Sequence, residues 1–361
     1  MKLTRPLLLT LAVLVAGCTF RNGKMEADAI LEGHFSNPLL PSGADPWVFT
    51  HDGYYYYTNT LQDSIGLWRT KDLADLKNAE YKTVFIPESG KPFSYELWAP
   101  EIMNISGKWY FYFAADDGDH FNHRIWVLEN PSADPFLGEF TMKGKLTADV
   151  GDNWAIDGSV FEHMGDHYFI WSGWLEPHDG TEIQRIYIAR MENPWTLATE
   201  RVELSRAEYD WERIYKNPEG WNNEPGHIVY VNEGPEVLKH ADKLFLIYSA
   251  SGCWTPHYCL GMLTADAEAD LLDASSWTKN PEPVFSHSPE NGVYGTGHNS
   301  FFKSPDGTED WIIYHANDQA DQGCGEFRSP RAQLIKWRDD GTPDFGIPLA
   351  ASTMIRKPSG L

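Results

Sequence analysis

The sequence lacks an apolar run long enough to cross a membrane as a mature helix. Its main apolar stretch, PLLLTLAVLVAG at residues 6–17, is shorter than the roughly 20 residues that a membrane-spanning helix needs. Lys2 and Arg5 precede this stretch, and a short basic segment followed by a short apolar one is typical of a secretory signal peptide. We therefore expect residues 1–17 to be removed when the chain is exported.

Cysteine is also scarce, with four in 361 residues. The first ends the segment VAGC at Cys18, which resembles the lipobox of bacterial lipoproteins, where the cysteine is lipidated and becomes the mature N-terminus. An ordinary secretory cleavage site with an incidental cysteine is the alternative. In the lipoprotein interpretation, the polar, aperiodic residues 18–36 form a tether, and the protein lies on the periplasmic face of a membrane or at the cell surface.

The other three cysteines are an odd number for an oxidising compartment. Cys253 and Cys259 lie in the segment GCWTPHYCLG, close enough to bridge a hairpin. The alternative is that both stay reduced and buried. Cys324, in QGCGEF, is expected to be free.

Basic residues are few, with 29 Lys and Arg against 52 Asp and Glu. The net charge is −23, and the loss of Lys2 and Arg5 with the signal peptide moves it to −25. Such a surface repels phosphate backbones and anionic lipid. We therefore expect a neutral substrate, no nucleic acid, membrane contact only through the lipid anchor, and a monomer.

No long helical period is present, and a β-strand pattern repeats instead. A turn containing Gly or Asp, followed by an aromatic strand, occurs five times, and the aligned aromatic residues are 56, 58, 77 and 66 positions apart. Those residues are Tyr57, Phe113, Trp171, Tyr248 and Tyr314. Intervals of this size are typical of the blades of a β-propeller.

Each aromatic strand follows a shorter apolar strand that begins with a polar cluster, and precedes a third strand-like run. The polar clusters read ADPWVF, WAPEIM, AIDGSVF, NEGPEVL and TGHNSFF. This pattern predicts an all-β fold, a five-bladed β-propeller over residues 37–361. A sandwich or a pair of barrels is the competing all-β interpretation, but neither needs a phased repeat.

The propeller fold brings the polar clusters together, because the first strand of every blade lines the central channel. One neighbourhood is therefore predicted to hold Asp45, Glu101, Asp157, Glu233 and His298. Unpaired buried carboxylates are costly, so their grouping indicates a function. Two chemistries fit: acid and base hydrolysis of a glycosidic bond, or cation binding by oxygen ligands. Taken singly, Asp45 and Asp157 could each cap a turn.

The ordered series NPLLPSGADPWV, WAPEI, AIDGSVF, NEGPEV and GTGHNSF closely resembles family 43 of the glycoside hydrolases, five-bladed propellers that hydrolyse arabinose- and xylose-containing polysaccharides. The segments GCWTPHYCLG and SPRAQLIKW are most similar to its exo-acting α-L-arabinofuranosidase branch. The resemblance implies an inverting enzyme that releases terminal L-arabinofuranose from α-1,5-linked arabinan or its oligosaccharides.

The resemblance also implies separate roles for the three acids. Asp45 matches the general base that activates water, and Glu233 matches the general acid that protonates the leaving oxygen. Asp157 matches the carboxylate that orients the acid and raises its pKa. For inversion, the two working carboxyls should lie about 6.5 to 9.5 Å apart.

Further residues are assigned by the same resemblance. His298 matches a histidine that faces a cation on the propeller axis, expected to be Ca²⁺ held through water, and no organic cofactor is expected. Arg331 matches a late arginine that grips the sugar, although a surface ion pair is the alternative. We also expect Trp98 and Glu101 to contact substrate, whereas Trp47 is expected in the core.

The same three acids are also compatible with β-xylosidase or endo-arabinanase activity, and both functions stay open. A non-catalytic glycan-binding lipoprotein is disfavoured because it would not need the three acids. A protein-binding propeller is disfavoured because the blades carry no WD-type signature. The related five-bladed fructan enzymes carry an Arg-Asp-Pro motif that these segments do not match.

Overall fold

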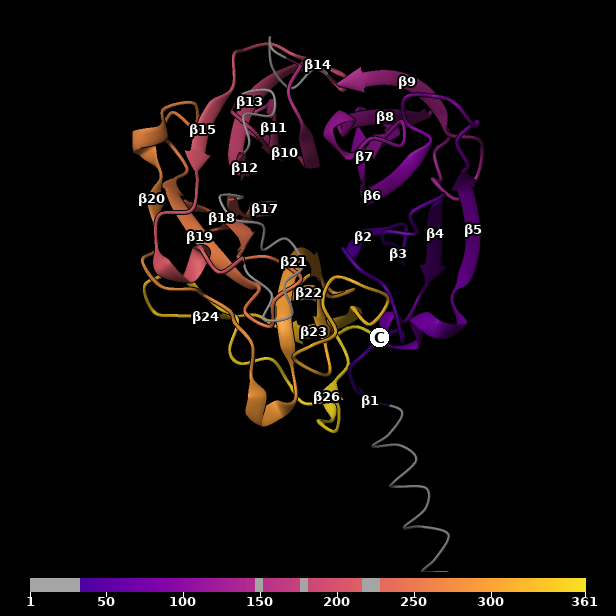
Figure 1. Cartoon of the computed structure of the whole chain (residues 1–361). Helices are drawn as coiled ribbons and strands as arrows, with labels where there is room; N and C mark the ends of the chain where they lie inside the picture. Colours follow the sequence, from indigo (N-terminus) through magenta and orange to yellow (C-terminus); the bar gives the residue numbers. More distant parts are fainter. Residues whose placement is uncertain (1–32, 147–151, 176–180, 216–227) are drawn as a thin grey trace, which may run out of the picture.

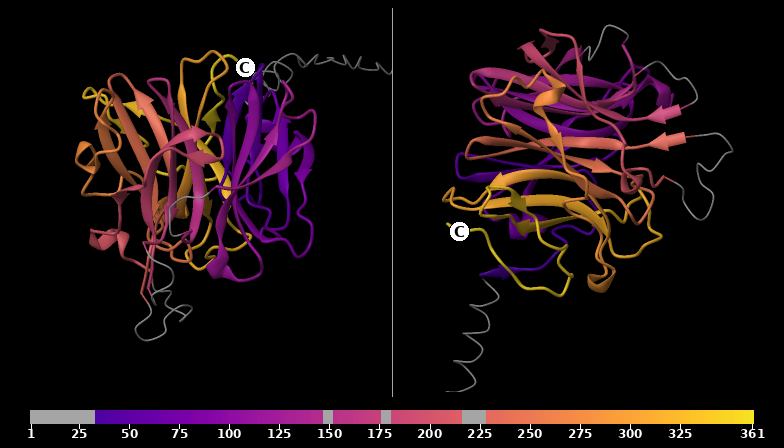
Figure 2. Two further views of the ribbon diagram at one scale, coloured as in Figure 1. Left: turned by 90° about the horizontal axis from the view of Figure 1, so that it is seen from above. Right: turned by 90° about the vertical axis from the view of Figure 1, so that its left-hand side faces the viewer.

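The computed structural model describes residues 33–146, 152–175, 181–215 and 228–361. These residues form five blades arranged around a central channel, as Figure 1 shows in a view along the channel and Figure 2 shows from two further sides. The predicted five-bladed β-propeller is therefore confirmed. Within the described ranges, no helix has the length and apolar character that a membrane span requires. The signal peptide, Cys18 and nearly all of the predicted tether lie outside these ranges.

Each blade is an antiparallel sheet whose first strand lines the channel. The first strands are β2 (Trp47–His51), β6 (Tyr95–Ile105), β10 (Ala155–His163), β17 (Asn232–His240) and β21 (Tyr294–Lys303). The second strands contain the five aligned aromatic residues, and they are β3 (Tyr54–Thr58), β7 (Lys108–Asp116), β11 (Asp166–Gly173), β18 (Lys243–Ala250) and β22 (Asp310–Asn317). The repeat in the sequence thus marks the second strand of every blade.

The outer strands vary more. The third strands are β4 (Ile65–Thr70), β8 (Arg124–Asn130), β13 (Arg185–Asn193), β19 (Cys259–Asp266) and β23 (Ser329–Leu334). Fourth positions are taken by β5 (Glu80–Phe85), β9 (Thr141–Leu146), β14 (Thr196–Leu197) with β15 (Val202–Ser205), and β20 (Thr278–Lys279). The fifth sheet is three-stranded in the described part of the chain.

The remaining elements are short. Two further strand pairs are β12 (Thr181–Ile183) with β16 (Ile228–Tyr230), and β24 (Lys336–Trp337) with β25 (Pro343–Asp344). The 3₁₀ turns are η1 (Leu73–Asn78), η2 (His120–Asn122), η3 (Asp210–Glu212), η4 (Ala274–Ser276) and η5 (Pro289–Asn291).

The hydrophobic core is divided among the interfaces between blades. Five buried clusters occur, and each is made by residues of two neighbouring blades. Large aromatic side chains dominate them; Trp109, Trp171 and Trp311 are each at most 2% exposed. Burying one such side chain stabilises the fold by roughly 2 to 3 kcal/mol. Each blade is therefore held chiefly by its neighbours, which fixes the position of its inner strand.

The ring is closed by the first described residues. β1 (His34–Phe35) pairs with β26 (Ile355–Arg356), and the Leu39 amide donates to the Pro330 carbonyl at 2.8 Å. The Asn37 side chain exchanges two hydrogen bonds with the backbone of Ala332. The start of the chain therefore joins the fifth blade to the first. Residues 34–35, assigned to the tether from sequence, belong to the folded unit.

The disulfide differs from the pairing proposed from sequence. Cys253 is bonded to Cys324, with a Cα–Cα distance of 5.3 Å, and Cys259 is the free, buried cysteine. Cys259 lies inside β19 and faces the carbonyl of Ala250, whereas Cys253 and Cys324 lie in loops of the fourth and fifth blades. Spacing along one hairpin could not reveal a bond between two blades.

Breaking this bond should destabilise the propeller. The two cysteines are 71 residues apart, and releasing a loop of that length costs about 4 kcal/mol in the chain-entropy model. We expect Cys324→Ser to lower the free energy of unfolding by up to that amount in urea titrations, and Cys259→Ser to have a smaller effect. Equal stability of Cys324→Ser and the unmutated protein would contradict the assignment.

Candidate active site

The five inner strands share one unusual backbone conformation where they enter the channel. At one residue of each blade, inside the inner strand in four blades and two residues before β2 in the first, φ lies between +44° and +57°, the left-handed region that side chains other than glycine disfavour by roughly 1 to 2 kcal/mol. The five residues are Asp45, Ala99, Asp157, Gly234 and His298. In four blades the strand pairing is irregular directly beside this position. The bend turns backbone and side chains of five blades toward one space.

This alignment refines the one made from sequence. Asp45, Asp157 and His298 occupy the bent position itself, whereas Glu233 lies one residue before it and Glu101 two residues after it. Glu101 therefore belongs to a second set of channel residues together with Ser159 and Glu236, rather than to the same set as Asp45. Sequence comparison of the clusters could not reveal this shift, because a β-bulge inserts residues without changing the polar pattern.

Asp45 is surrounded by donors. Its carboxylate accepts hydrogen bonds from Thr60 Oγ1 at 2.6 Å and from Arg328 at 3.1 Å, and His298 Nδ1 lies 3.3 Å away. The side chain of Asp45 is only 8% exposed. Burial alone would raise its pKa, but Arg328, with smaller contributions from His298 and His315, holds the pKa well below its usual value. Asp45 is therefore ionised at neutral pH.

The two histidines beside Asp45 are neutral. His315 Nδ1 accepts the backbone N–H of Asp45 at 3.1 Å, and burial lowers the pKa of His315 to about 4. Burial also lowers the pKa of His298. The full positive charge that faces Asp45 is thus the guanidinium of Arg328.

Glu233 has the opposite electrostatic character. Burial raises its pKa to about 7; a hydrogen bond from Tyr258, whose hydroxyl lies 2.7 Å from Oε1, acts against this shift, and the charge of Asp45 adds to it. Asp157 is buried nearby, and burial followed by the charges of Glu233 and Asp45 raises its pKa well above the usual value. One pocket therefore contains an ionised carboxylate and a carboxyl that keeps its proton near neutral pH.

Gly234 holds Asp157 beside Glu233. Its backbone N–H donates to Asp157 Oδ2 at 2.9 Å. A Cβ atom at this position would lie 3.2 Å from the His298 ring, and the φ of +53° is one that glycine tolerates. The NEGPE segment thus requires glycine next to Glu233 both for the backbone conformation and for space.

Glu101 is buried at 5% exposure and has one carboxylate oxygen, Oε2, without a hydrogen-bond partner. Burial, followed by the charge of Glu236, raises its pKa well above the usual value. Ser159 donates to Glu236 at 2.9 Å, and burial raises the pKa of Glu236 to about 8. Contact of Glu101 with substrate, as expected from sequence, stays a prediction.

The arginine beside the base is Arg328, which the sequence analysis missed. Arg331, the one expected to grip the sugar, is 0% exposed and forms an ion pair with Asp318 at 2.5 Å. Both residues lie in the segment that contains β23, and their difference is one of position: Arg328 precedes the strand, whereas Arg331 lies inside it. Arg331 is thus buried in this structure, and its contact with the sugar stays a prediction.

The two tryptophans behave differently. Trp47 is 5% exposed and donates to the Ile102 carbonyl, so its prediction as a core residue is confirmed. Trp98 is partly exposed, stacks on the ring of His123 at 4.0 Å and donates to Gln62. Trp98 therefore has a ring edge available at the mouth of the channel, and its contact with a sugar stays a prediction.

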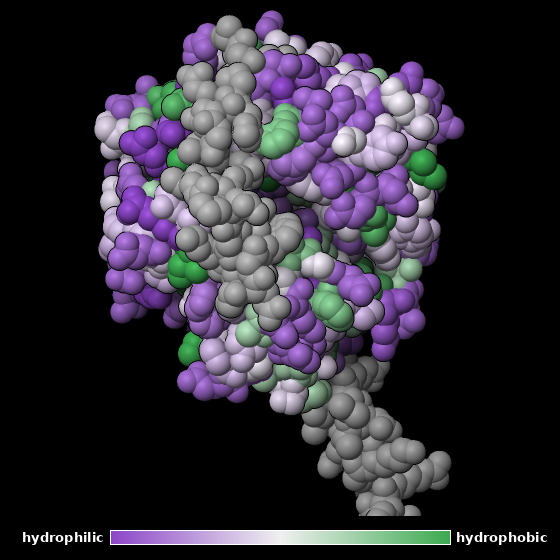
Figure 3. Space-filling model, viewed as in Figure 1, coloured by the Kyte–Doolittle hydropathy of each residue, from purple (hydrophilic) through white to green (hydrophobic). Residues whose placement is uncertain are grey.

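Tyr258, His315 and Thr60 were also missed from sequence. Each contacts a candidate catalytic carboxylate or its backbone, but each lies in a second strand, a loop or the turn after a strand, outside the polar clusters that were compared. Figure 3 shows the face onto which the channel opens, with a hollow near its centre and a largely hydrophilic rim.

Comparison with known proteins agrees with this arrangement. Residues 35–343 match the sequence model of Glycosyl hydrolases family 43. The chain is 40% identical over 325 residues to a protein of Streptomyces avermitilis named extracellular exo-alpha-(1->5)-L-arabinofuranosidase, covering 88% of this chain and 64% of that relative. A protein of the same name from Streptomyces chartreusis is 39% identical, with 78% of this chain and 82% of the relative covered.

A solved structure is similar as well. The alpha-L-arabinofuranosidase from Lactobacillus brevis has a TM-score of 0.80 and 36% identity, covering 88% of this chain and 98% of that one. The match to the family model extends over most of the chain, and the matched region includes the acids Asp45, Asp157 and Glu233. The chain therefore belongs to glycosyl hydrolase family 43.

Proposed function

We propose that this chain is an exo-acting α-L-arabinofuranosidase that releases terminal L-arabinofuranose from α-1,5-linked arabinan or arabino-oligosaccharides with inversion. The observation that carries the proposal is the opposite tuning of Asp45 and Glu233 within one pocket. Two titratable groups whose pKa values are pushed apart are the signature of a base and an acid. The names of the relatives in Streptomyces and Lactobacillus support the choice of sugar.

The reaction follows from the two protonation states. Asp45, kept ionised by Arg328, accepts a proton from water as that water attacks the anomeric carbon. Glu233 gives its proton to the departing glycosidic oxygen as the bond to the anomeric carbon breaks. Asp157, held in place by the Gly234 amide, is the proposed orienting partner of Glu233, while burial and the charge of Asp45 raise the pKa of Glu233. The product sugar carries the new hydroxyl on the opposite face, which is inversion.

We propose further that the protein is exported and anchored by a lipid on Cys18. The relatives in Streptomyces are named extracellular enzymes, and the signal sequence with its VAGC ending supports the anchor. An arabinose-containing glycan outside the cytoplasm is the corresponding substrate.

Substrate choice is tested with aryl α-L-arabinofuranoside, aryl β-D-xyloside and linear arabinan. We expect cleavage of the first and release of single arabinose units from the last. Glu233→Ala should lose about 10²- to 10⁴-fold in kcat on arabino-oligosaccharide, and less on the aryl glycoside because its leaving group needs little protonation. The exposed Glu88→Ala is the control. Cleavage of the xyloside alone, or internal cutting of arabinan, would refute the assignment.

The base is tested separately. Asp45→Ala should be nearly inactive on both kinds of substrate, and azide should restore cleavage of the aryl glycoside by giving a glycosyl azide of inverted configuration. Full activity of Asp45→Ala in the absence of azide would rule out the mechanism.

The pH profile should report Glu233. Since the acid must be protonated, activity should fall as the pH rises through about 7, the pKa of Glu233. The Tyr258 hydroxyl stabilises the ionised carboxylate, so Tyr258→Phe should raise this pKa and move the alkaline limb upward, by about one pH unit for a hydrogen bond of ordinary strength. Tyr55→Phe, which removes a buried hydroxyl without a partner, is the control. A limb that stays in place or moves downward in Tyr258→Phe would contradict the role of Glu233.

A hard cation such as Ca²⁺ is proposed on the channel axis beside His298. Two buried groups of the channel support the proposal: burial lowers the pKa of His298, and Glu101 Oε2 is buried without a hydrogen-bond partner. Such an ion prefers oxygen ligands and would offset the acidic charge, with His298 acting through water.

Removal of the ion should be measurable. We expect Ca²⁺ at 100 times its Kd to stabilise the chelator-treated protein by about 2.7 kcal/mol, read as a rise in melting temperature. His298→Ala should show a smaller rise. A melting temperature of the unmutated protein that is the same in Ca²⁺ and in chelator would exclude the ion.

A further inference from the structure

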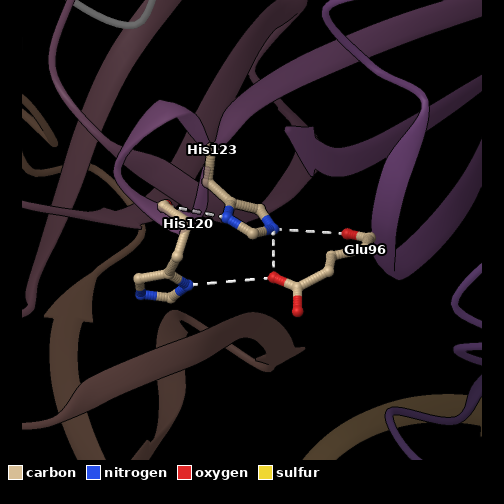
Figure 4. A group of neighbouring side chains, drawn as sticks. All are labelled: Glu96, His120 and His123. Carbon is tan, nitrogen blue, oxygen red and sulfur yellow. Dashed lines mark hydrogen bonds and ion pairs between the residues drawn. The ribbon is translucent and has the colours of Figure 1, made fainter. Parts of the chain in front are cut away.

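A second group of metal-ligating side chains lies on the second blade, separate from the carboxylates of the pocket. It consists of Glu96, at the start of β6, and of His120 and His123, in and directly after η2. Figure 4 shows both imidazole rings turned toward the Glu96 carboxylate. His120 Nδ1 and His123 Nε2 each lie 3.9 Å from Glu96 Oε2, and all three donor atoms lie within 4.8 Å of one another.

The ring of His123 is oriented as a ligand would be. Its side chain is fully buried, and its Nδ1 lies 3.0 Å from the His120 carbonyl oxygen and 3.2 Å from Asp116 Oδ2. Both neighbours are acceptors, so the proton of the neutral ring resides on Nδ1. Nε2 then directs its lone pair toward Glu96. Metal-binding histidines are held in this manner, with the second nitrogen donating to a carbonyl or carboxylate.

This orientation places electron-rich atoms against one another. Besides Oε2, the backbone carbonyl oxygen of Glu96 lies 3.3 Å from His123 Nε2. If Nε2 carries no proton, its lone pair faces two oxygen atoms of Glu96, and these electron-rich atoms repel one another. A bound cation would remove this repulsion.

Asp116 is a second carboxylate beside the group. It is 1% exposed, its Oδ1 accepts the Gly118 amide, and its buried Oδ2 lies 3.2 Å from His123 Nδ1. The neighbouring cation, Arg124, already forms an ion pair with Asp152 at 3.1 Å. Among the described side chains, the carboxylates of Glu96 and Asp116 thus lie beside the two imidazoles, while the ion pair of Arg124 is made with Asp152.

The frame of the group is rigid, while two of its ligands can adjust. Trp98 stacks on His123, and Trp154 donates to the His120 carbonyl at 2.9 Å. The side chains of Glu96 and His120 are 47% and 42% exposed. Since Zn²⁺ binds imidazole nitrogen at about 2.0–2.1 Å, tetrahedral ligands lie roughly 3.3 Å apart, so each imidazole nitrogen must come about 0.6 Å closer to Glu96 Oε2 and the two nitrogens must also approach each other. Exposed side chains can make that movement.

We propose that Glu96, His120 and His123 bind a divalent transition metal ion of the zinc class at the rim of the pocket, with one coordination position open to water. Two imidazoles and one carboxylate suit Zn²⁺ or Co²⁺, whereas Ca²⁺ prefers a larger set of oxygens. The ion joins the start of β6 to the loop after β7. It also lies beside Trp98, whose neighbour Ala99 donates to Thr60, the partner of Asp45.

The test is calorimetric titration of Zn²⁺ into the untagged full chain, in saturating Ca²⁺ and without substrate. We expect one Zn²⁺ per chain, and a Kd raised at least about tenfold in Glu96→Gln and in His120→Ala. His167→Ala, which removes a histidine at the far end of β11, is the matched control and should bind as the unmutated protein does. Near-ultraviolet circular dichroism verifies the fold of each variant.

A second measurement needs no variant. Co²⁺ bound by two imidazoles and a carboxylate should give the intense visible bands of a four-coordinate ion, and Zn²⁺ should displace it. The proposal is overturned if the unmutated protein binds no Zn²⁺, if Glu96→Gln and His120→Ala bind it as tightly as His167→Ala, or if bound Co²⁺ keeps the weak spectrum of the hydrated ion. In each of those cases the three residues form only a hydrogen-bonded cluster.

Discussion

The active site depends on a bend that every inner strand makes at the mouth of the channel. A regular strand would send successive side chains alternately to the two faces of its blade, toward the two neighbouring blades. The left-handed residue interrupts this alternation, so that Asp45, Asp157 and His298 meet although they come from three blades. Four of the five bent residues are not glycine, and the packing between blades must offset that strain. The interfaces between blades thus support the geometry of the site.

The different roles proposed for Asp45 and Glu233 arise from their different electrostatic surroundings. Asp45 and Glu233 are both buried, and burial by itself raises the pKa of each. What separates them is one guanidinium: Arg328 contacts Asp45 directly, while Glu233 has a tyrosine hydroxyl as its partner. A hydroxyl stabilises a carboxylate less than a full positive charge does, so Asp45 is ionised at neutral pH whereas Glu233, with a pKa of about 7, keeps its proton in a large fraction of the molecules.

Much of the fold could be predicted from the sequence because the aromatic second strands repeat at blade-sized intervals. The three catalytic candidates were also found, since their polar clusters keep phase with that repeat. What was missed depends on contacts between blades: Arg328 reaches Asp45, and Cys253 bonds to Cys324. These residues lie in loops, and the loops do not follow the repeat from which the strands were predicted. Arg328 and Arg331 could not be distinguished from sequence, because only three positions along one segment separate a residue that contacts Asp45 from a fully buried one.

The ion pair between Arg328 and Asp45 joins residues that are 283 positions apart, on either side of the seam where the ring closes. The base therefore acquires its compensating charge only when the last blade has docked against the first. A chain whose ring stays open would lack that neighbour, and Asp45 would then hold a proton more tightly. The electrostatic state of Asp45 thus depends on closure of the ring, even though Asp45 itself belongs to the first blade.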